Sequence, residues 1–142
     1  MDAKRSDQRL VWAGYLFALG SAVHLFDHLR RGQGSVTEQL YWAGNLALIV
    51  QVAVITLILA RHRVAPLAAA AAGFPLAIGF AAAHWLPRWS ELSDSFIDDG
   101  APLFSYVASS LEIAGALAVG FAGLAIIRTR GLATMSSRAS VA

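Results

Sequence analysis

The sequence predicts an all-α integral membrane protein with four transmembrane helices in an up-down bundle. Three observations support this class: 57% of the 142 residues are hydrophobic, only 14% are charged, and the apolar residues form four long runs. Crossing a hydrocarbon core takes about 20 helical residues, and each run is long enough. Soluble domains carry close to twice this share of charge, so the composition argues against a soluble fold.

Short polar segments separate the predicted spans, which cover residues 10–29, 38–60, 65–86 and 102–127. Gly32 and Gly34 end the first span with a turn-like segment, and Pro66 suits the first turn of the third. We expect one four-helix transmembrane domain over residues 1–130. The remainder, residues 131–142, is small and polar and is predicted to be a disordered cytoplasmic tail.

The basic residues predict the orientation. Eight of the 11 Lys and Arg residues lie before the first span, between the second and third, or after the fourth. Cytoplasmic segments of membrane proteins are rich in Lys and Arg, so we expect a multi-pass protein of the plasma or inner membrane with both termini cytoplasmic. The net charge of +2 follows from this topology. No basic face is present to predict a nucleic-acid partner.

The segment between the third and fourth spans, residues 87–101, has two interpretations. Apolar residues at helical spacing, including Trp89, Leu92 and Phe96, alternate with acidic ones. This pattern predicts an amphipathic helix lying on the outer membrane surface. The alternative is an ordinary acidic loop in water.

A repeated pattern predicts that the chain is a duplicated helical hairpin. In the first and third spans, two glycines six residues apart precede a histidine by four or five residues: Gly14, Gly20 and His24, then Gly73, Gly79 and His84.

Ionisable side chains gather on one face of the first span, where lipid would make them unfavourable without a reason. His24, Asp27 and His28 share a helical face because residues three and four apart lie close together. The other spans carry stripes of small and polar residues that favour helix contact, so we expect their polar groups to converge on one outward-facing site. Its predicted ligands are His24, Asp27, His28, His84 and Glu112, with Glu38, Asn45, Ser105 and Ser109 as supporting polar groups.

Three kinds of ligand suit this site: a metal ion, haem or a small lipophilic molecule. Two histidines at i and i+4 present two nitrogens to one ion, and a chain without cysteine would bind zinc, copper(II) or iron through N and O atoms. Haem would instead be held between His84 and a histidine of the first span.

The alternative is a non-catalytic accessory or assembly subunit whose polar residues only hold helices together. The expected pairs are Asp27 with Arg30 or Arg31, Glu112 with His24, and His84 with Asn45 or a backbone carbonyl. A proton pathway is a further interpretation of the same groups. An enzyme is less favoured, because Ser105 and Ser109 lie in no nucleophile motif.

Besides the lipid bilayer, the expected partners are a second copy of the chain or a larger membrane complex. Gln51 falls on a different face of its span from Asn45 and is predicted to face a neighbouring subunit.

Overall fold

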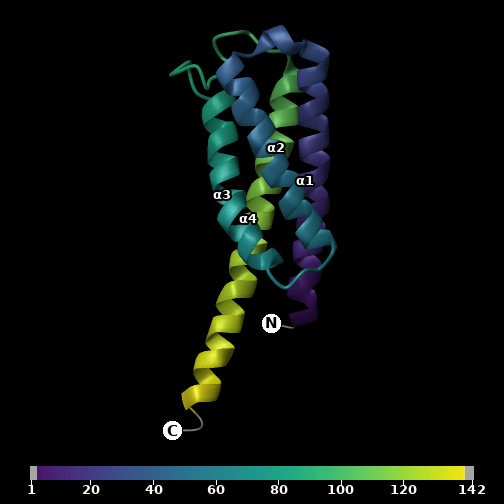
Figure 1. The fold of residues 1–142 in the computed structure, drawn as a ribbon, viewed down its shortest axis with the longest axis vertical. Helices are drawn as coiled ribbons and strands as arrows, with labels where there is room; N and C mark the ends of the chain where they lie inside the picture. The colour runs from purple at the N-terminus through teal and green to yellow at the C-terminus, as the bar shows by residue number, and fades with distance from the viewer. Residues whose placement is uncertain (1–2, 140–142) are drawn as a thin grey trace.

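The computed structural model describes residues 3–139, which form four α-helices and one short 3₁₀ turn (Figure 1). In chain order these are α1 (Ala3–Arg31), η1 (Gln33–Ser35), α2 (Glu38–Leu59), α3 (Ala65–His84) and α4 (Leu103–Ala139). Each predicted span coincides with one helix, and all four helices are long and apolar enough to cross a membrane. The start of α1 and the end of α4 lie at the lower end in Figure 1, whereas η1 and the connection between α3 and α4 lie at the upper end.

Local signals in the sequence set the helix ends. Gly32 leaves the helical region with φ of 85°, which glycine adopts without a steric penalty, and α1 ends there. Thr37 caps α2 by accepting a hydrogen bond from the backbone N–H of Leu40. Pro66 stands in the first turn of α3, where its missing N–H is not needed. The turns that bring successive helices together are therefore encoded locally.

Glycines bring α1 and α3 close to α4, which lies between them. At Gly20, Gly73 and Gly115 an added Cβ would stand 2.6, 2.5 and 2.5 Å from backbone atoms of the facing helix. No side chain fits at such distances, so these positions need glycine. The predicted small-residue stripes thus form the contact surfaces of these three helices.

α2 packs less closely than the other helices. Its buried residues are Gln51, Val54 and Ile58, all in its second half, whereas Trp42 and Leu46 in its first half are exposed. α2 therefore stands away from α1 and α3 at the upper end of the bundle. The two predicted hairpins are not packed equivalently, and their duplication stays a prediction.

The prediction for Gln51 was wrong. Its side chain is only 3% exposed and accepts a hydrogen bond from the hydroxyl of Ser21 on α1. Figure 1 shows α2 running obliquely across the bundle, and this tilt, which packing sets, turns the amide into the protein. Gln51 therefore gives no support for a second subunit.

The described helix α4 extends past the predicted end of the fourth span, and the predicted disorder of residues 131–142 stays a prediction. α4 continues through Gly131 to Ala139, and residues 140–142 lie outside the described residues. The sequence from 132 to 139 contains no proline or glycine, and Ala, Leu, Met and Arg favour helix.

The connection between α3 and α4 is not an amphipathic helix but a loop whose ends are largely exposed and whose middle is buried. Ser93, Asp94, Ser95 and Phe96 are buried, and the chain folds back over the upper end of α3. The N–H groups of Asp94 and Phe96 donate to the carbonyls of Ala83 and His84, at 2.9 and 3.0 Å. These bonds satisfy the last carbonyls of α3 and hold the segment against the bundle.

Candidate metal centre

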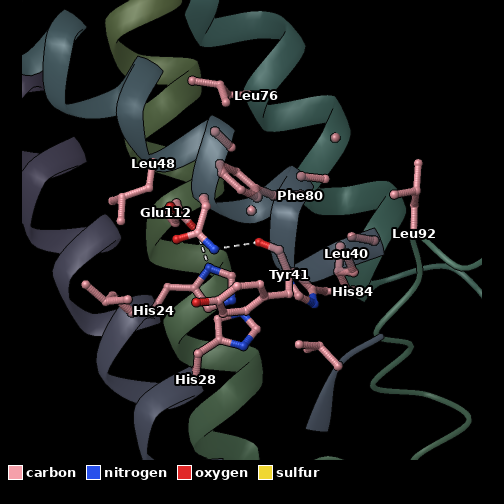
Figure 2. Close-up of a pocket in the computed structure, with 18 of the residues that line it drawn as sticks. His24, His28, Leu40, Tyr41, Leu48, Leu76, Phe80, His84, Leu92 and Glu112 are labelled. Carbon is pink, nitrogen blue, oxygen red and sulfur yellow. Dashed lines mark hydrogen bonds and ion pairs between the residues drawn. The ribbon is translucent and has the colours of Figure 1, made fainter. Parts of the chain in front are cut away.

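Three histidines meet at the upper end of the bundle. His24 and His28 occupy consecutive turns of α1, and His84 is the last residue of α3. The ring centroids lie 4.7 Å apart for His24 and His28, 4.7 Å for His24 and His84, and 5.8 Å for His28 and His84. One ring nitrogen from each lies within 4.8 Å of the other two (Figure 2). The predicted convergence of these three residues is present in the structure.

Glu112 on α4 orients the ring of His24. Its carboxylate contacts Nδ1 of His24 directly, and both side chains are buried. Gly20 makes this contact possible, because without a side chain α1 approaches the backbone of Glu112 one turn below His24. A carboxylate partner holds the proton on Nδ1 and leaves the lone pair on Nε2. That Nε2 atom is buried and has no hydrogen-bond partner among the described residues.

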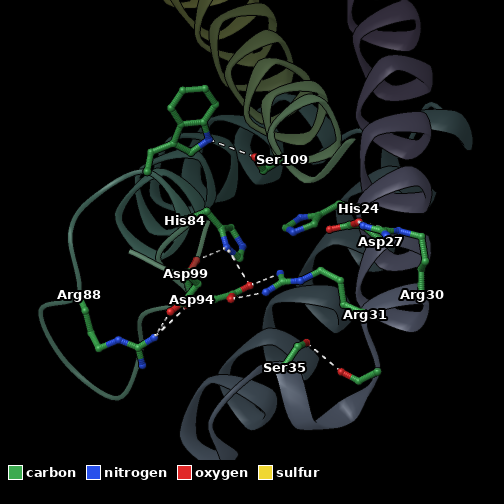
Figure 3. A network of polar contacts seen from close by, with 12 residues as sticks. His24, Asp27, Arg30, Arg31, Ser35, His84, Arg88, Asp94, Asp99 and Ser109 are labelled. Carbon is green, nitrogen blue, oxygen red and sulfur yellow. Dashed lines mark hydrogen bonds and ion pairs between the residues drawn. The ribbon is translucent and has the colours of Figure 1, made fainter. Parts of the chain in front are cut away.

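Asp94 plays the corresponding part for His84. Nδ1 of His84 lies 3.2 Å from the backbone carbonyl oxygen of Asp94 and 3.5 Å from its carboxylate, and Phe96 stacks on the ring at a centroid distance of 4.6 Å. The Asp94 carboxylate also accepts two hydrogen bonds from the guanidinium of Arg31, at 2.5 and 2.6 Å (Figure 3). A paired fork of this kind fixes both partners, so Asp94 ties the end of α1 to the end of α3.

The charge of Asp94 is retained despite burial. Burial alone raises the pKa of a carboxyl, but the hydrogen bonds from Arg31 and His84 and the charge of Arg31 outweigh it and hold the pKa of Asp94 well below its usual value. Asp94 is therefore a carboxylate at neutral pH. The sequence did not single out Asp94, which was only one of several acidic residues among the apolar ones of this segment.

Asp27 lies apart from the three rings. Its carboxylate is buried and accepts a hydrogen bond from Arg30, one turn further along α1, at 2.7 Å (Figure 3). This local pairing was expected as an alternative to metal binding. The cluster of ligand atoms within 4.8 Å of one another consists of the three histidines and does not include Asp27, whose role as a ligand stays a prediction.

Of the four residues predicted to support the site, one lines the cavity and three do not. Asn45 lines the cavity beside the histidines, and its amide donates to the backbone carbonyl of Tyr41 at 2.8 Å rather than to His84. Glu38 is exposed at the start of α2 and does not line this cavity. Ser105 and Ser109 are buried on α4 outside it, and Ser109 accepts a hydrogen bond from Trp85.

A cavity of about 690 Å³ adjoins the three histidines, in the space that the first half of α2 leaves open. Its wall is mostly apolar, and Figure 2 shows Leu48, Leu76 and Phe80 around it. The polar side chains that reach it include the three histidines, Asn45, Gln51 and Glu112. Pockets of this volume, apolar with a few converging polar groups, are typical of ligand sites.

No protein family, curated protein or solved structure matched this chain. The assignment of function therefore rests on the arrangement of its own residues. Three imidazoles with a shared focus, two of them backed by acceptors on Nδ1, form the kind of site that binds a divalent transition-metal ion.

Proposed function

We propose that this protein is a membrane-embedded metal-binding protein in which His24, His28 and His84 hold one zinc-like divalent ion. The observation that carries the proposal is the meeting of three ring nitrogens within 4.8 Å. Zinc–nitrogen bonds of 2.0–2.1 Å in a tetrahedral site would place the ligand nitrogens about 3.3 Å apart. The rings therefore need to move only slightly to bind an ion.

The surroundings of the rings support metal binding. The contacts on Nδ1 of His24 and His84 leave their Nε2 atoms as donors to an ion, as outer partners of metal-bound histidines do. Three nitrogen ligands leave the fourth tetrahedral position open, as in catalytic and substrate-binding zinc sites. That position would face the apolar cavity.

A metal ion suits the geometry better than haem. Two axial histidines have to lie on opposite faces of a wide planar ring. Here His24 and His84 meet edge to face at 4.7 Å, with His28 beside both of them, so the rings surround a point rather than a plane.

The proposal includes a location. Four helices long and apolar enough to cross a membrane and the distribution of Lys and Arg favour a multi-pass protein of the plasma or inner membrane, with cytoplasmic termini. The upper end of the bundle would then face outward. In that orientation the histidines lie within the outer half of the membrane.

The test is the metal content of the purified protein. We expect about one equivalent of zinc or cobalt(II) per chain after equilibration and desalting, and a large loss in His24→Ala and His84→Ala. His62→Ala is the matched control, because His62 lies exposed in the α2–α3 turn at the other end of the bundle. Equal metal content in the wild type and His84→Ala would refute the proposed centre.

A second candidate function is the accessory or assembly subunit, since its expected pairs are present: Asp27 with Arg30, Glu112 with His24, and His84 with a backbone carbonyl. His28 separates the two candidates. Among the described contacts its ring touches the other two rings but makes no hydrogen bond. His28→Ala should remove the metal if the site binds one, and should change little if the network is only structural.

A further inference from the structure

We propose that the open position of the metal centre binds the carboxylate of a single-chain amphiphile, a fatty acid, whose alkyl chain occupies the cavity between α1, α2 and α3. This inference rests on the proposed metal centre and names the class of ligand that completes it.

The shape of the cavity suits one alkyl chain. Its wall extends along α2 from Leu40 to Gln51, which is about 16 Å at 1.5 Å per residue. The lining residues of the cavity are mainly Leu, Ala and Gly. The histidines lie part of the way along this wall. An alkyl chain whose carboxylate binds the metal would therefore lie beside apolar residues of the wall.

The cavity opens sideways, between helices. Gly44 on α2 and Gly79 on α3 both line it and both are exposed, and an added Cβ at either would meet nothing within 4 Å. Leu25 and Leu29 of α1 line it as well and are 43% and 72% exposed. With the four helices in a membrane, this opening faces lipid chains, so an amphiphile would enter from the bilayer.

Charge balance favours a carboxylate head. Asp27 and Asp94 are paired with Arg30 and Arg31, so Glu112 alone is left to offset a divalent ion held by neutral histidines. The centre would then carry one uncompensated positive charge in a region of low dielectric, which is unfavourable. An anionic ligand removes this charge, and carboxylate oxygens bind zinc at about 2.0–2.2 Å. An alcohol or an ester would not neutralise it.

The experiment uses the full chain loaded with cobalt(II) in phosphatidylcholine nanodiscs, with the visible absorption of the metal as the readout. Palmitate at micromolar concentration should change the spectrum in a saturable way. Methyl palmitate, which has the chain without the charge, and acetate, which has the charge without the chain, should leave it unchanged at the same concentration. Equal responses to palmitate and methyl palmitate would overturn the proposal.

A second experiment fills the cavity with larger side chains. The double variant Gly44→Leu, Gly79→Leu should keep its cobalt and bind palmitate at least tenfold more weakly. Ala71→Leu is the matched control, an exposed residue of α3 outside the cavity that should bind palmitate as the wild type does. Unchanged palmitate binding in the double variant would refute the assigned position of the chain.

The two proposals fail in different ways. A protein that binds no cobalt or zinc refutes the metal centre and this inference together. A protein that holds cobalt stably but shows no spectral response to palmitate retains the metal centre and overturns the fatty-acid ligand alone.

Discussion

Replacing Glu112 by glutamine removes one carboxylate beside the proposed metal centre and little else. The amide keeps an oxygen that can accept a hydrogen bond from Nδ1 of His24, so the shape of the contact is largely retained. Outer partners of metal-bound histidines typically contribute 10–100-fold in metal affinity, which corresponds to about 1.4 to 2.7 kcal/mol. Because Glu112 and His24 are both buried, we expect an effect within this range.

The assay is competition for zinc against a chromophoric chelator at fixed pH, with thermal unfolding of the zinc-free protein alongside. Ser110→Ala is the matched control: it lies two residues earlier on α4, and its hydroxyl bonds only the carbonyl of Tyr106 among the described contacts. In the zinc-free protein, Glu112→Gln and His24→Ala should be coupled by about 0.5 to 3 kcal/mol in a double-mutant cycle. Zinc affinity within threefold of the wild type, together with additive effects on unfolding, would show that Glu112 does not act on His24.

Gly73→Ala should lower the free energy of unfolding by about 1 to 3 kcal/mol through overpacking. Gly79→Ala on the same helix should be neutral or slightly stabilising, because its Cβ meets nothing within 4 Å. Equal melting temperatures for the two variants would refute the close contact of Gly73 with α4. Asp94→Asn should cost about 3 to 5 kcal/mol at pH 7, since it leaves a buried guanidinium unpaired. Because the pKa of Asp94 is lowered in the folded state, this stabilisation is present at neutral pH and begins to be lost only as pH falls below about 4. The acid titrations of both proteins should therefore approach each other below about pH 4 and converge only well below it. Cysteine at Gly34 should react with an impermeant thiol reagent on intact cells and cysteine at His62 should not, and the reverse pattern would invert the proposed orientation.

The sequence was sufficient for the helices and for part of the site. The length of each apolar run predicts a helix, and the spacing of His24 and His28 places both rings on one face. The pairing of Glu112 with His24 also followed, because a carboxylate inside a span needs a cation or a proton. These features depend on periodicity and on the unfavourable free energy of charge in lipid, and both can be evaluated from residue order alone.

The remaining features depend on contacts between distant segments. Asp94 reaches His84 because the chain after α3 folds back on the last carbonyls of that helix. The helical periodicity of the same segment predicted instead an amphipathic helix on the membrane surface. Gln51 is buried because α2 tilts, and the tilt is set by packing rather than by hydropathy. Asp27 pairs through Oδ1 with Arg30 one turn away, and its role as a ligand stays a prediction.

The loosely packed first half of α2 lines the cavity, whereas the candidate ligand residues lie on the other three helices. The helices that carry the histidines and Glu112 are α1, α3 and α4, whereas α2 supplies much of the opposite wall of the cavity. Residues such as Leu40 and Leu48 can therefore vary in size without disturbing the groups that would hold an ion. The shape of the cavity and the arrangement of the histidines can therefore be altered separately, by substitutions on different helices.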